Sequence, residues 1–341
     1  MKPPFPIKDI AFQAGLSPAT VDRALHARPG VRRVTQARVR AAIAELERQY
    51  AEAGLAGRRF SIDIVMEAPR RFTNAVRIAF EAELPSMRPA AFSARLHLAE
   101  TFAENQLLVI LRGIRRRGSH GVVLKAPLRP ATTAMATNLM QAGIPVVTLV
   151  TDMPDACRIG YVGIDNRVAG ATAAWLLGNM MGPKPARVLL ALSSALFAGE
   201  DERGQGFREA LADRFPHLST VTVSEGYGVD HTTGVLVRDV LETHADIAAV
   251  YSIGGGNRAI LKAFEEQRRT CAVFAAHDLD SDNRTLLTER RLTFVLHHDL
   301  RQDARSACQM FLAHHRMLPA NFRIEPSRVA IATPYDASSY S

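Results

Sequence analysis

Short β-rich runs alternate with amphipathic helical segments from residue 61 onward, and this alternation is the strongest constraint on the fold. The runs are SIDIVM, ARLHLA, GVVLK, IPVVTLV, RVLLAL, IAAVYSI, CAVFAA and LTFVL. The clearest helical segments between them are Asn105–Arg117, Val168–Met181, Arg203–Phe215 and Arg258–Arg269. Strands that are joined through helices form parallel sheets with right-handed crossovers. This number of strands predicts an α/β body of two doubly wound parallel-sheet lobes.

The first 49 residues have a different pattern, which predicts three short helices. In the segment IKDIAFQAGLSPATV, apolar residues from Ile7 to Ala14 recur at helical spacing, and Gly15 suits a helix C-terminus. Ser17 and Pro18 are a preferred N-cap and a preferred first helical residue. A third periodic segment begins near Thr35. Two short helices joined by a tight turn and braced by a third form a helix-turn-helix unit.

Charge and composition narrow the class of protein. Residues 1–59 contain 11 Lys and Arg against 5 Asp and Glu, whereas the whole chain has a formal net charge of +8. A basic head on a nearly neutral body predicts a polyanionic partner for the head. The three cysteines form no zinc or disulfide pattern, and neither a secretory signal nor an apolar membrane span is present in the sequence. We therefore expect a cytoplasmic, nucleoid-associated protein.

The second helix of the head predicts a DNA-reading surface. Its outer side presents Ala19, Arg23 and His26. Small residues let the backbone approach base edges in the major groove, and an arginine reaches guanine with two hydrogen bonds. Further arginines follow, among them Arg32 and Arg38, where phosphate contacts would fix the register. The alternative is a small helical bundle that only packs against the rest of the chain.

The head resembles the DNA-binding domain of the LacI/GalR family of transcriptional regulators. The resemblance lies in IKDIAFQAGLSPATV, Arg23-Ala24-Leu25 and VRRVTQARVRAAIAEL. It implies that Pro18, Ala19 and Arg23 face bases and that Ser17 and Thr20 bind phosphate. Asp22 stands where the family usually has serine, so the operator is expected to differ from the usual one. The full predicted DNA-binding set is Ser17, Pro18, Ala19, Thr20, Arg23, His26, Arg32, Arg38 and Leu55.

Residues 50–60 are expected to form a linker or hinge between a DNA-binding domain (1–49) and an effector-binding domain (61–341). Family members usually have an Asn-x-x-Ala-x-x-Leu hinge helix at this point. Here ERQYAEAGLAGRR matches only the end of that motif, at Leu55-Ala56-Gly57. Two interpretations stay open, which are a helix that inserts Leu55 into the minor groove and a plain flexible linker.

Polar side chains follow the predicted strands of the body. In open α/β sheets ligands bind at the carboxyl ends of strands, and an aromatic ring with several carboxylates, amides and arginines suits a polyhydroxylated molecule. Each residue taken alone also fits a turn or a helix cap, and their recurrence at strand ends favours a site. The predicted effector-binding set is Arg71, Phe72, Asn74, Asp152, Asp165, Asn166, Arg203, Asn257, Asp278 and His297.

The body resembles the type I periplasmic-binding-protein fold that the same family uses as its effector domain. The matching segments are YVGIDNRVAGATAAWLL, ERGQGF and HDLD…LTFVLHHDL. The resemblance implies an N-lobe near 61–163 and 298–328, a C-lobe near 164–297 and 329–341, and a ligand cleft between them. His297 stands where sugar-binding relatives often have glutamine, and GGGN replaces the usual Asn-Asp, so the ligand identity stays open.

The prediction is therefore a ligand-responsive DNA-binding regulator, a repressor released by a small sugar, polyol or sugar acid. We expect a homodimer, or a tetramer, on a pseudo-palindromic double-stranded operator, with no cofactor, no metal and no membrane partner. Two alternatives remain, a transport-type solute-binding protein and an α/β enzyme fused to a DNA-binding module. The chain has no P-loop, nucleophile elbow or zinc-protease motif. His277-Asp278 with His297-His298-Asp299 is the one group that could hold Zn²⁺.

Overall fold

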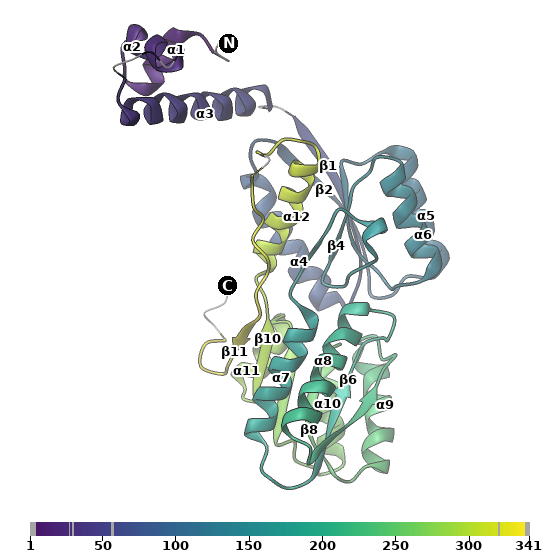
Figure 1. Cartoon of the computed structure of the whole chain (residues 1–341). Coiled ribbons are helices and arrows are strands. Elements are labelled where there is room, and N and C mark those ends of the chain that lie inside the picture. The colour runs from purple at the N-terminus through teal and green to yellow at the C-terminus, as the bar shows by residue number, and fades with distance from the viewer. Residues whose placement is uncertain (1–4, 27, 29–30, 56–57, 320, 338–341) are drawn as a thin grey trace. The chain divides into compact units, whose positions relative to one another are not determined.

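The computed structural model describes residues 5–26, 28, 31–55, 58–319 and 321–337, without the side chains of residues 48–55. The chain divides into two compact units. One unit, the head, contains the residues up to Arg59 together with Arg88–Ala91, and the other, the body, contains the rest. Each unit is described separately below (Figure 1).

The head contains the three expected helices, α1 (Ile7–Ala14), α2 (Pro18–Leu25) and α3 (Arg33–Leu55). Gly15 ends α1 in the left-handed conformation (φ 59°), which a residue without a Cβ adopts at little cost. Ser17 caps α2, since its hydroxyl accepts a hydrogen bond from the Thr20 amide at 3.2 Å. Ile10, Val21 and Val39 are buried together from the three helices. The helix-turn-helix prediction is confirmed.

The third helix of the head is longer than the sequence pattern predicts. It begins at Arg33, two residues before Thr35, and it continues through Leu55. Residues 50–55 of the expected linker are therefore helical. The proposed wedge, the side chain of Leu55, lies outside the described residues, and so do residues 56 and 57 of the linker.

The first lobe of the body is built on a five-stranded sheet with strand order β2-β1-β3-β4-β5. In this sheet β1 is parallel to β3, β3 is parallel to β4, and β4 is parallel to β5. The elements are β1 (Arg59–Glu67), α4 (Arg70–Glu83), η1 (Leu84–Ser86), β2 (Ala91–Ala99), α5 (Glu104–Arg117), β3 (Gly121–Lys125), α6 (Pro130–Gln141), β4 (Val146–Leu149), η2 (Asp155–Cys157) and β5 (Gly160–Val162).

The second lobe is built on a six-stranded sheet with strand order β11-β10-β9-β8-β6-β7. All pairs are parallel except that of β10 with β11. The elements from here to the end of the chain are α7 (Asn166–Met180), β6 (Ala186–Ala191), α8 (Ala198–Arg214), β7 (Leu218–Val223), α9 (Asp230–Thr243), β8 (Ile247–Ser252), α10 (Asn257–Glu266), β9 (Val273–His277), α11 (Ser281–Thr288), β10 (Phe294–His297), α12 (Leu300–His314) and β11 (Ala330–Ala332).

Both sheets are covered by helices on their two faces, so each lobe has two apolar cores. Central strands such as β3 and β4 are buried along their whole length. Strands that are buried on both faces read as continuous apolar runs, which is why the sequence located them. The α/β class with two doubly wound lobes is confirmed.

Three strands and one helix boundary differ from the sequence expectation. The sequence analysis did not include β5, β7 or β11, which are short or have exposed positions. The last of these is antiparallel, so the second sheet is not wholly parallel. The helix expected at Arg203–Phe215 begins five residues earlier, at Ala198. As a result Glu200 and Arg203 lie one turn apart on the same helix.

The chain passes between the two lobes three times. It leaves β5 and enters α7 across Gly163 and Asp165, and it returns after β10 to form α12, which packs against α4 of the first lobe (Figure 1). The segment after α12 then leads back to β11 in the second sheet. The three crossing segments form a hinge of the kind that permits lobe closure.

Helices α7 and α8 pack closely because two glycines lie at their contact. A Cβ on Gly170 would lie 2.0 Å from the carbonyl oxygen of Arg203, and one on Gly206 would lie 2.2 Å from the carbonyl oxygen of Arg167. Any side chain at either position would push the two backbones apart. The backbone of Arg203 is therefore set by contact with α7.

We predict that Gly170→Ala lowers the free energy of unfolding by about 1–3 kcal/mol, the usual cost of overpacking a tight contact. Gly113→Ala is the matched control, because a Cβ on Gly113 of α5 meets nothing within 4 Å. It should leave stability unchanged or raise it by up to about 1 kcal/mol. Urea denaturation of both variants measures this. Equal stabilities of the two variants would contradict the packing argument.

Candidate functional site

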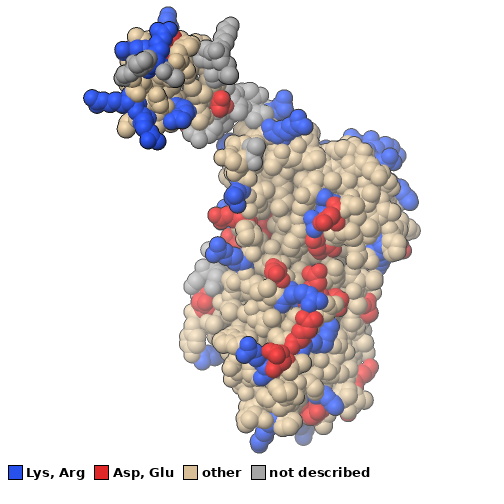
Figure 2. Space-filling view, in the orientation of Figure 1, with Lys and Arg blue, Asp and Glu red and all other residues tan. Residues whose placement is uncertain are grey.

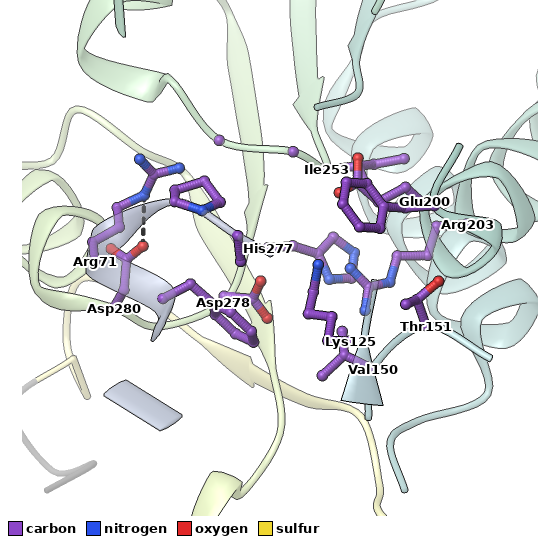
Figure 3. A pocket seen from close by; sticks show the side chains of 16 residues that line it. Arg71, Lys125, Val150, Thr151, Glu200, Arg203, Ile253, His277, Asp278 and Asp280 are labelled. Atoms are coloured by element: carbon purple, nitrogen blue, oxygen red, sulfur yellow. Dashed lines mark ion pairs between the residues drawn. The ribbon is translucent and has the colours of Figure 1, made fainter. Parts of the chain in front are cut away.

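A cavity in the body lies where strands of both sheets end. It is lined from the first lobe by Ala68–Pro69, Arg71, Phe72, Lys125, Val150 and Thr151, and from the second by Phe197, Glu200, Arg203, Ile253–Gly255, His277, Asp278 and Asp280. These residues follow β1, β3, β4, β6, β8 and β9 at their carboxyl ends. This is the edge at which parallel α/β sheets bind ligands. The cavity therefore lies between the two lobes (Figure 3).

An ion pair crosses the cavity from one lobe to the other. Arg71, near the start of α4, places its Nε 2.8 Å from a carboxylate oxygen of Asp280, which follows β9. The same guanidinium donates to the carbonyl of Gly228 at 3.0 Å. The cavity has a volume of ≈ 30 Å³, which is room for roughly two water molecules. The lobes are therefore in a closed arrangement, and we call the Arg71–Asp280 pair the interlobe latch.

Two further cations lie at the other end of the cavity. Arg203 is 2% exposed, and its Nε donates to the side-chain oxygen of Asn166 at 2.8 Å. Lys125 is 6% exposed, and its Nζ donates to the carbonyl of Glu67 at 3.1 Å. The Lys125 ammonium also lies 4.0 Å from the ring centroid of Phe197. Burial lowers the pKa of Lys125.

Most polar neighbours of these cations are hydrogen-bonded to other groups of the protein. Glu200 accepts hydrogen bonds from the amide and the hydroxyl of Ser193 at 2.7 and 2.6 Å. His277 shares a hydrogen bond of 2.6 Å between its Nε2 and the hydroxyl of Tyr251. Burial and the nearby charge of Arg203 hold the pKa of His277 well below its usual range. His277 is therefore neutral at physiological pH.

The backbone around the cavity adopts unusual conformations. Val150 and Asp278 have positive φ angles of 64° and 65°. This is an uncommon region for a β-branched residue and costs of order 1–3 kcal/mol. Gly255 (φ 91°) allows the latch to form, because a Cβ there would lie 1.7 Å from the guanidinium of Arg71. Strained positions of this kind cluster at binding sites.

Four of the ten predicted effector-binding residues line this cavity, namely Arg71, Phe72, Arg203 and Asp278. Phe72 is 5% exposed and also belongs to the apolar core of the first lobe. Asn166 does not line the cavity, but its side-chain oxygen accepts the hydrogen bond that positions Arg203. Asn257 is buried and donates to Asn283 at 2.6 Å, and His297 is buried at the end of β10.

The three remaining predicted residues have local partners elsewhere. Asn74 accepts hydrogen bonds from Arg77 on α4. Asp152 forms an ion pair with Arg158, and Asp165 caps α7 by accepting from the Val168 amide at 2.9 Å. Asp152, Asp165 and Asn166 line a second groove at the lobe crossings rather than the interlobe cavity.

The sequence analysis missed several cavity residues, although the sequence pattern around three of them could have indicated a site. Lys125 ends the otherwise apolar run GVVLK, and a lysine at the end of a buried strand is unusual. Glu200 precedes Arg203 by three residues, which is one helical turn. Asp280 lies two residues after Asp278 in AHDLD. Thr151 and Phe197 gave no comparable signal.

The head presents the predicted DNA-binding residues on its surface. Ser17, Pro18, Ala19, Arg23 and His26 are exposed along α2 and its cap, and Thr20 is half-buried. Arg32 is also exposed, just before α3. Lys and Arg side chains cover much of the head in the view of Figure 2, and few acidic side chains accompany them. The start of α2 adds the positive end of a helix dipole to this surface.

Two charged residues of the head have contacts within it. Asp22 forms ion pairs with His26 at 3.2 Å and with Arg28 at 3.5 Å, so its carboxylate is balanced locally. Arg38 donates from its guanidinium to the carbonyl of Ala14 at 2.8 Å and so caps the C-terminal end of α1. A mutation of Arg38 would therefore affect the folding of the head as well as any phosphate contact.

The histidines considered for zinc are divided between other partners. His298 forms a buried pair with Asp303 at 2.7 Å, and His277 bonds to Tyr251. Among the described residues, no three His, Cys, Asp or Glu side chains are grouped so that they could hold a metal ion. Across the same residues, no helix combines the length and apolar character needed to cross a lipid bilayer.

Comparison with known sequences identifies both units. The profile of the periplasmic binding protein domain matches residues 99–316, and that of the lacI family of bacterial regulatory proteins matches residues 6–49. An uncharacterised HTH-type transcriptional regulator in the aml 5′ region of Streptomyces limosus is 28% identical over 214 residues, which are 61% of this chain and 58% of that protein. The chain thus matches less than two thirds of the length of this relative.

Solved structures share the fold of the body. GanP, a glucose-galactose binding protein from Geobacillus stearothermophilus, is similar with a TM-score of 0.71 and 17% identity over 82% of this chain and 98% of that one. AraP, an arabinose binding protein from the same organism, has a TM-score of 0.66 and 18% identity over 83% and 99%. A protein from Bacteroides fragilis, whose title proposes that it is a LacI transcriptional regulator, has a TM-score of 0.69 and 14% identity over 83% of this chain and 99% of that one.

The chain belongs to the family of the periplasmic binding protein domain, whose model matches more than half of its length, and its head matches the lacI family of bacterial regulatory proteins.

We predict that Asp280 makes the stability of the body depend on pH. Burial raises the pKa of Asp280 from 3.8 to about 6, against the opposing effect of Arg71. The folded protein therefore binds the proton on Asp280 more tightly than the unfolded chain does. The stability that this proton adds is fully present below pH 3.8, and it is lost as the pH rises through about 6. Between pH 7 and pH 5 the wild type should gain about 1 kcal/mol relative to Asp280→Asn.

Denaturant titrations at both pH values measure this difference. Asp282→Asn is the control, because Asp282 is an exposed neighbour paired with Arg258. Its profile should follow that of the wild type. A wild type and an Asp280→Asn variant with the same change in stability between pH 7 and pH 5 would show that this carboxyl is not the titrating group.

Proposed function

We propose that the chain is a repressor that a small polyhydroxylated effector releases from its operator. The observation that carries the proposal is the interlobe cavity, which places Arg203, Asp278 and Phe72 at the facing strand ends of two hinged lobes. Carboxylate and guanidinium groups bind hydroxyls in pairs, and an aromatic ring packs on the C–H face of a sugar. The structural relatives named above bind glucose, galactose and arabinose by their titles, which supports a sugar-like effector.

The closed arrangement indicates how an effector would act. A cavity of ≈ 30 Å³ is too small for a sugar, so the lobes must part before it enters and close to a different spacing around it. An effector shifts this equilibrium only by binding one arrangement better than the other. The first strand of the body, β1, follows the head directly in the chain. A change of lobe arrangement would therefore change the spacing of two heads in a dimer.

We propose a homodimer on a pseudo-palindromic operator in the cytoplasm. One head would read DNA through a single helix of eight residues, α2. Specific affinity of the usual strength needs more contacts than this, and a two-fold pair doubles them. Half-sites would then lie about 34 Å apart, one turn of DNA. The effector weakens operator binding if it moves the two heads away from this spacing.

Arg23→Ala should lower affinity for the operator by roughly 1–3 kcal/mol per half-site and leave non-specific binding nearly unchanged. Arg23 is exposed on α2, and its guanidinium donates a 3.3 Å hydrogen bond to the carbonyl of Ala19 on the same helix. Electrophoretic shift with the chain's own upstream DNA and with scrambled DNA measures both affinities.

Arg214→Ala serves as the control, since Arg214 is an exposed arginine at the end of α8 in the body. Sedimentation of the wild-type complex should give two chains per operator. Equal losses of affinity for Arg23→Ala on operator and scrambled DNA would refute the base contact. One chain per tightly bound operator would refute the dimer.

Asp278→Ala should abolish effector-induced release and leave operator affinity in the absence of effector within about twofold. Asp278 lines the cavity and belongs to the body, whereas the DNA-reading residues belong to the head. A screen of sugars, polyols and sugar acids by thermal shift first finds an effector, because a ligand at 100 times its Kd adds about 2.7 kcal/mol of stability.

Operator release is then titrated with that effector for the wild type, for Asp278→Ala and for Asp246→Ala. Asp246 is an exposed aspartate of the same lobe that pairs with Arg187. Only Asp278→Ala should lose the response. Release of Asp278→Ala from DNA at the wild-type effector concentration would place the effector elsewhere.

A further inference from the structure

A cluster of arginines lies at one end of the first lobe, away from the interlobe cavity. Two segments of the chain contain no Asp or Glu, residues 105–151 and residues 304–324. The first includes the run Arg115-Arg116-Arg117, which forms the last turn of α5. The second includes Arg316, two residues after the end of α12. We call the part of the first lobe that these four arginines occupy the basic end.

The residues that follow α5 and α12 lie side by side. The ring of His315 donates from Nε2 to the carbonyl of His120 at 2.8 Å. The ring of Phe60 contacts both histidines, with centroids 4.8 Å from that of His120 and 5.1 Å from that of His315. Phe60 is 4% exposed, so these contacts are part of the packed lobe. They bring Arg316 and the arginine run to the same end of the lobe.

The chain enters the body at the basic end. Strand β1 is parallel to β3, and Ile62 of β1 pairs with Gly121 of β3. Phe60 is therefore level with Ser119, which comes two residues after the arginine run. Only five residues separate Phe60 from Leu55, the last residue of α3 in the head. Any DNA that the head binds is thus tethered to this end of the body, and tethering raises its effective concentration there.

Three of the four arginines have no carboxylate in contact. Arg115, Arg116 and Arg316 are exposed, and none of them forms an ion pair among the described residues. Arg117 differs, because its guanidinium pairs with the buried carboxylate of Asp63 at 2.6 Å. Lys and Arg side chains lie along the upper end of the body in Figure 2, with few acidic side chains among them. A surface of one charge sign attracts a polyanion.

The acidic residues at the end of α4 do not offset these three charges. Glu81 pairs with Arg77 at 2.6 Å. Glu83 is 3% exposed, and its carboxylate is bound by Arg301 at 2.7 Å and by Arg305 at 3.0 Å. Both carboxylates keep their negative charge, but each already has at least one arginine of its own. The three unpaired arginines therefore remain free to bind a phosphate.

We propose that Arg115, Arg116 and Arg316 bind phosphates of the DNA that the head holds. This inference goes beyond the proposed function, which places the DNA contacts in the head alone. Guanidinium groups bind phosphate oxygens through charge-assisted hydrogen bonds, and contacts to the DNA backbone add affinity without reading the sequence. The basic end would therefore strengthen binding to operator and to other DNA alike, whereas Arg23 strengthens operator binding selectively.

The test measures how the affinity for DNA depends on salt. The full-length wild type and the triple variant Arg115→Gln/Arg116→Gln/Arg316→Gln are titrated by fluorescence anisotropy with the chain's own upstream DNA and with scrambled DNA, between about 50 and 200 mM KCl. Each phosphate contact contributes about 0.9 to the slope of log Kd against log salt concentration. We expect the slope to fall by about 2.7 on both duplexes, with the ratio of the two affinities unchanged.

A matched triple variant of the second lobe is the control. Lys184→Gln/Arg214→Gln/Arg268→Gln removes the same charge from exposed residues at or just after the ends of α7, α8 and α10. It should keep the wild-type slope. Changing the three arginines of the basic end to lysine keeps their charges and should keep most of the slope. Cations at a helix C-terminus also stabilise the helix, so the melting temperature of every variant is measured alongside.

Each outcome decides for or against the inference. A folded glutamine triple with the wild-type slope overturns it, leaves the proposed function standing, and leaves the basic end to an acidic protein partner or to a role in helix stability. Equal falls in slope for both triples also overturn it, because they show an effect of net charge. If the triple does not fold, Arg316→Gln alone decides, with an expected fall of about 0.9. Wild-type protein that binds neither duplex contradicts the inference and the proposed function together.

Discussion

The body depends on one buried guanidinium, that of Arg203. A cation that is 2% exposed is stable only where its surroundings supply hydrogen bonds. Asn166 supplies one at 2.8 Å from the first turn of α7, directly after the chain crosses from the first lobe. Gly170 allows α7 to touch the backbone of Arg203 itself. The position of the cation, the path of the crossing and the packing of α7 on α8 are therefore determined together.

This arrangement connects the cavity to the hinge. A ligand that binds Arg203 would act on a side chain that is hydrogen-bonded to Asn166, directly after the first crossing between the lobes. A ligand that reaches Arg71 would compete with Asp280 for its guanidinium. Under the proposed function the lobes would alternate between two arrangements, the one closed by the Arg71–Asp280 pair and one closed around an effector. Because packed interfaces switch between states and do not deform continuously, a small molecule between the lobes can reposition a whole lobe.

The sequence predicted the fold well because buried parallel strands are continuous apolar runs, as GVVLK and IPVVTLV are. It missed β7, which is fully buried only at its two end residues, and β5, which has only three residues. It placed Arg203 and Asp278 in the cavity because strand ends converge there. It also selected Asn74 and Asp152, which have local partners, because the direction of a side chain after a strand depends on the loop. Lys125 was missed because a single lysine usually indicates a solvated surface.

The central claim is that one equilibrium between lobe arrangements couples effector binding to DNA binding. Linkage makes this coupling reciprocal, so the factor by which effector weakens the operator complex must equal the factor by which operator weakens effector binding. The most direct measurement is the Kd of the effector, determined by calorimetry with the free protein and with the protein saturated with operator. The account predicts a weaker effector Kd on DNA, by the same factor that effector changes the operator Kd. Equal effector affinities with and without operator would contradict it.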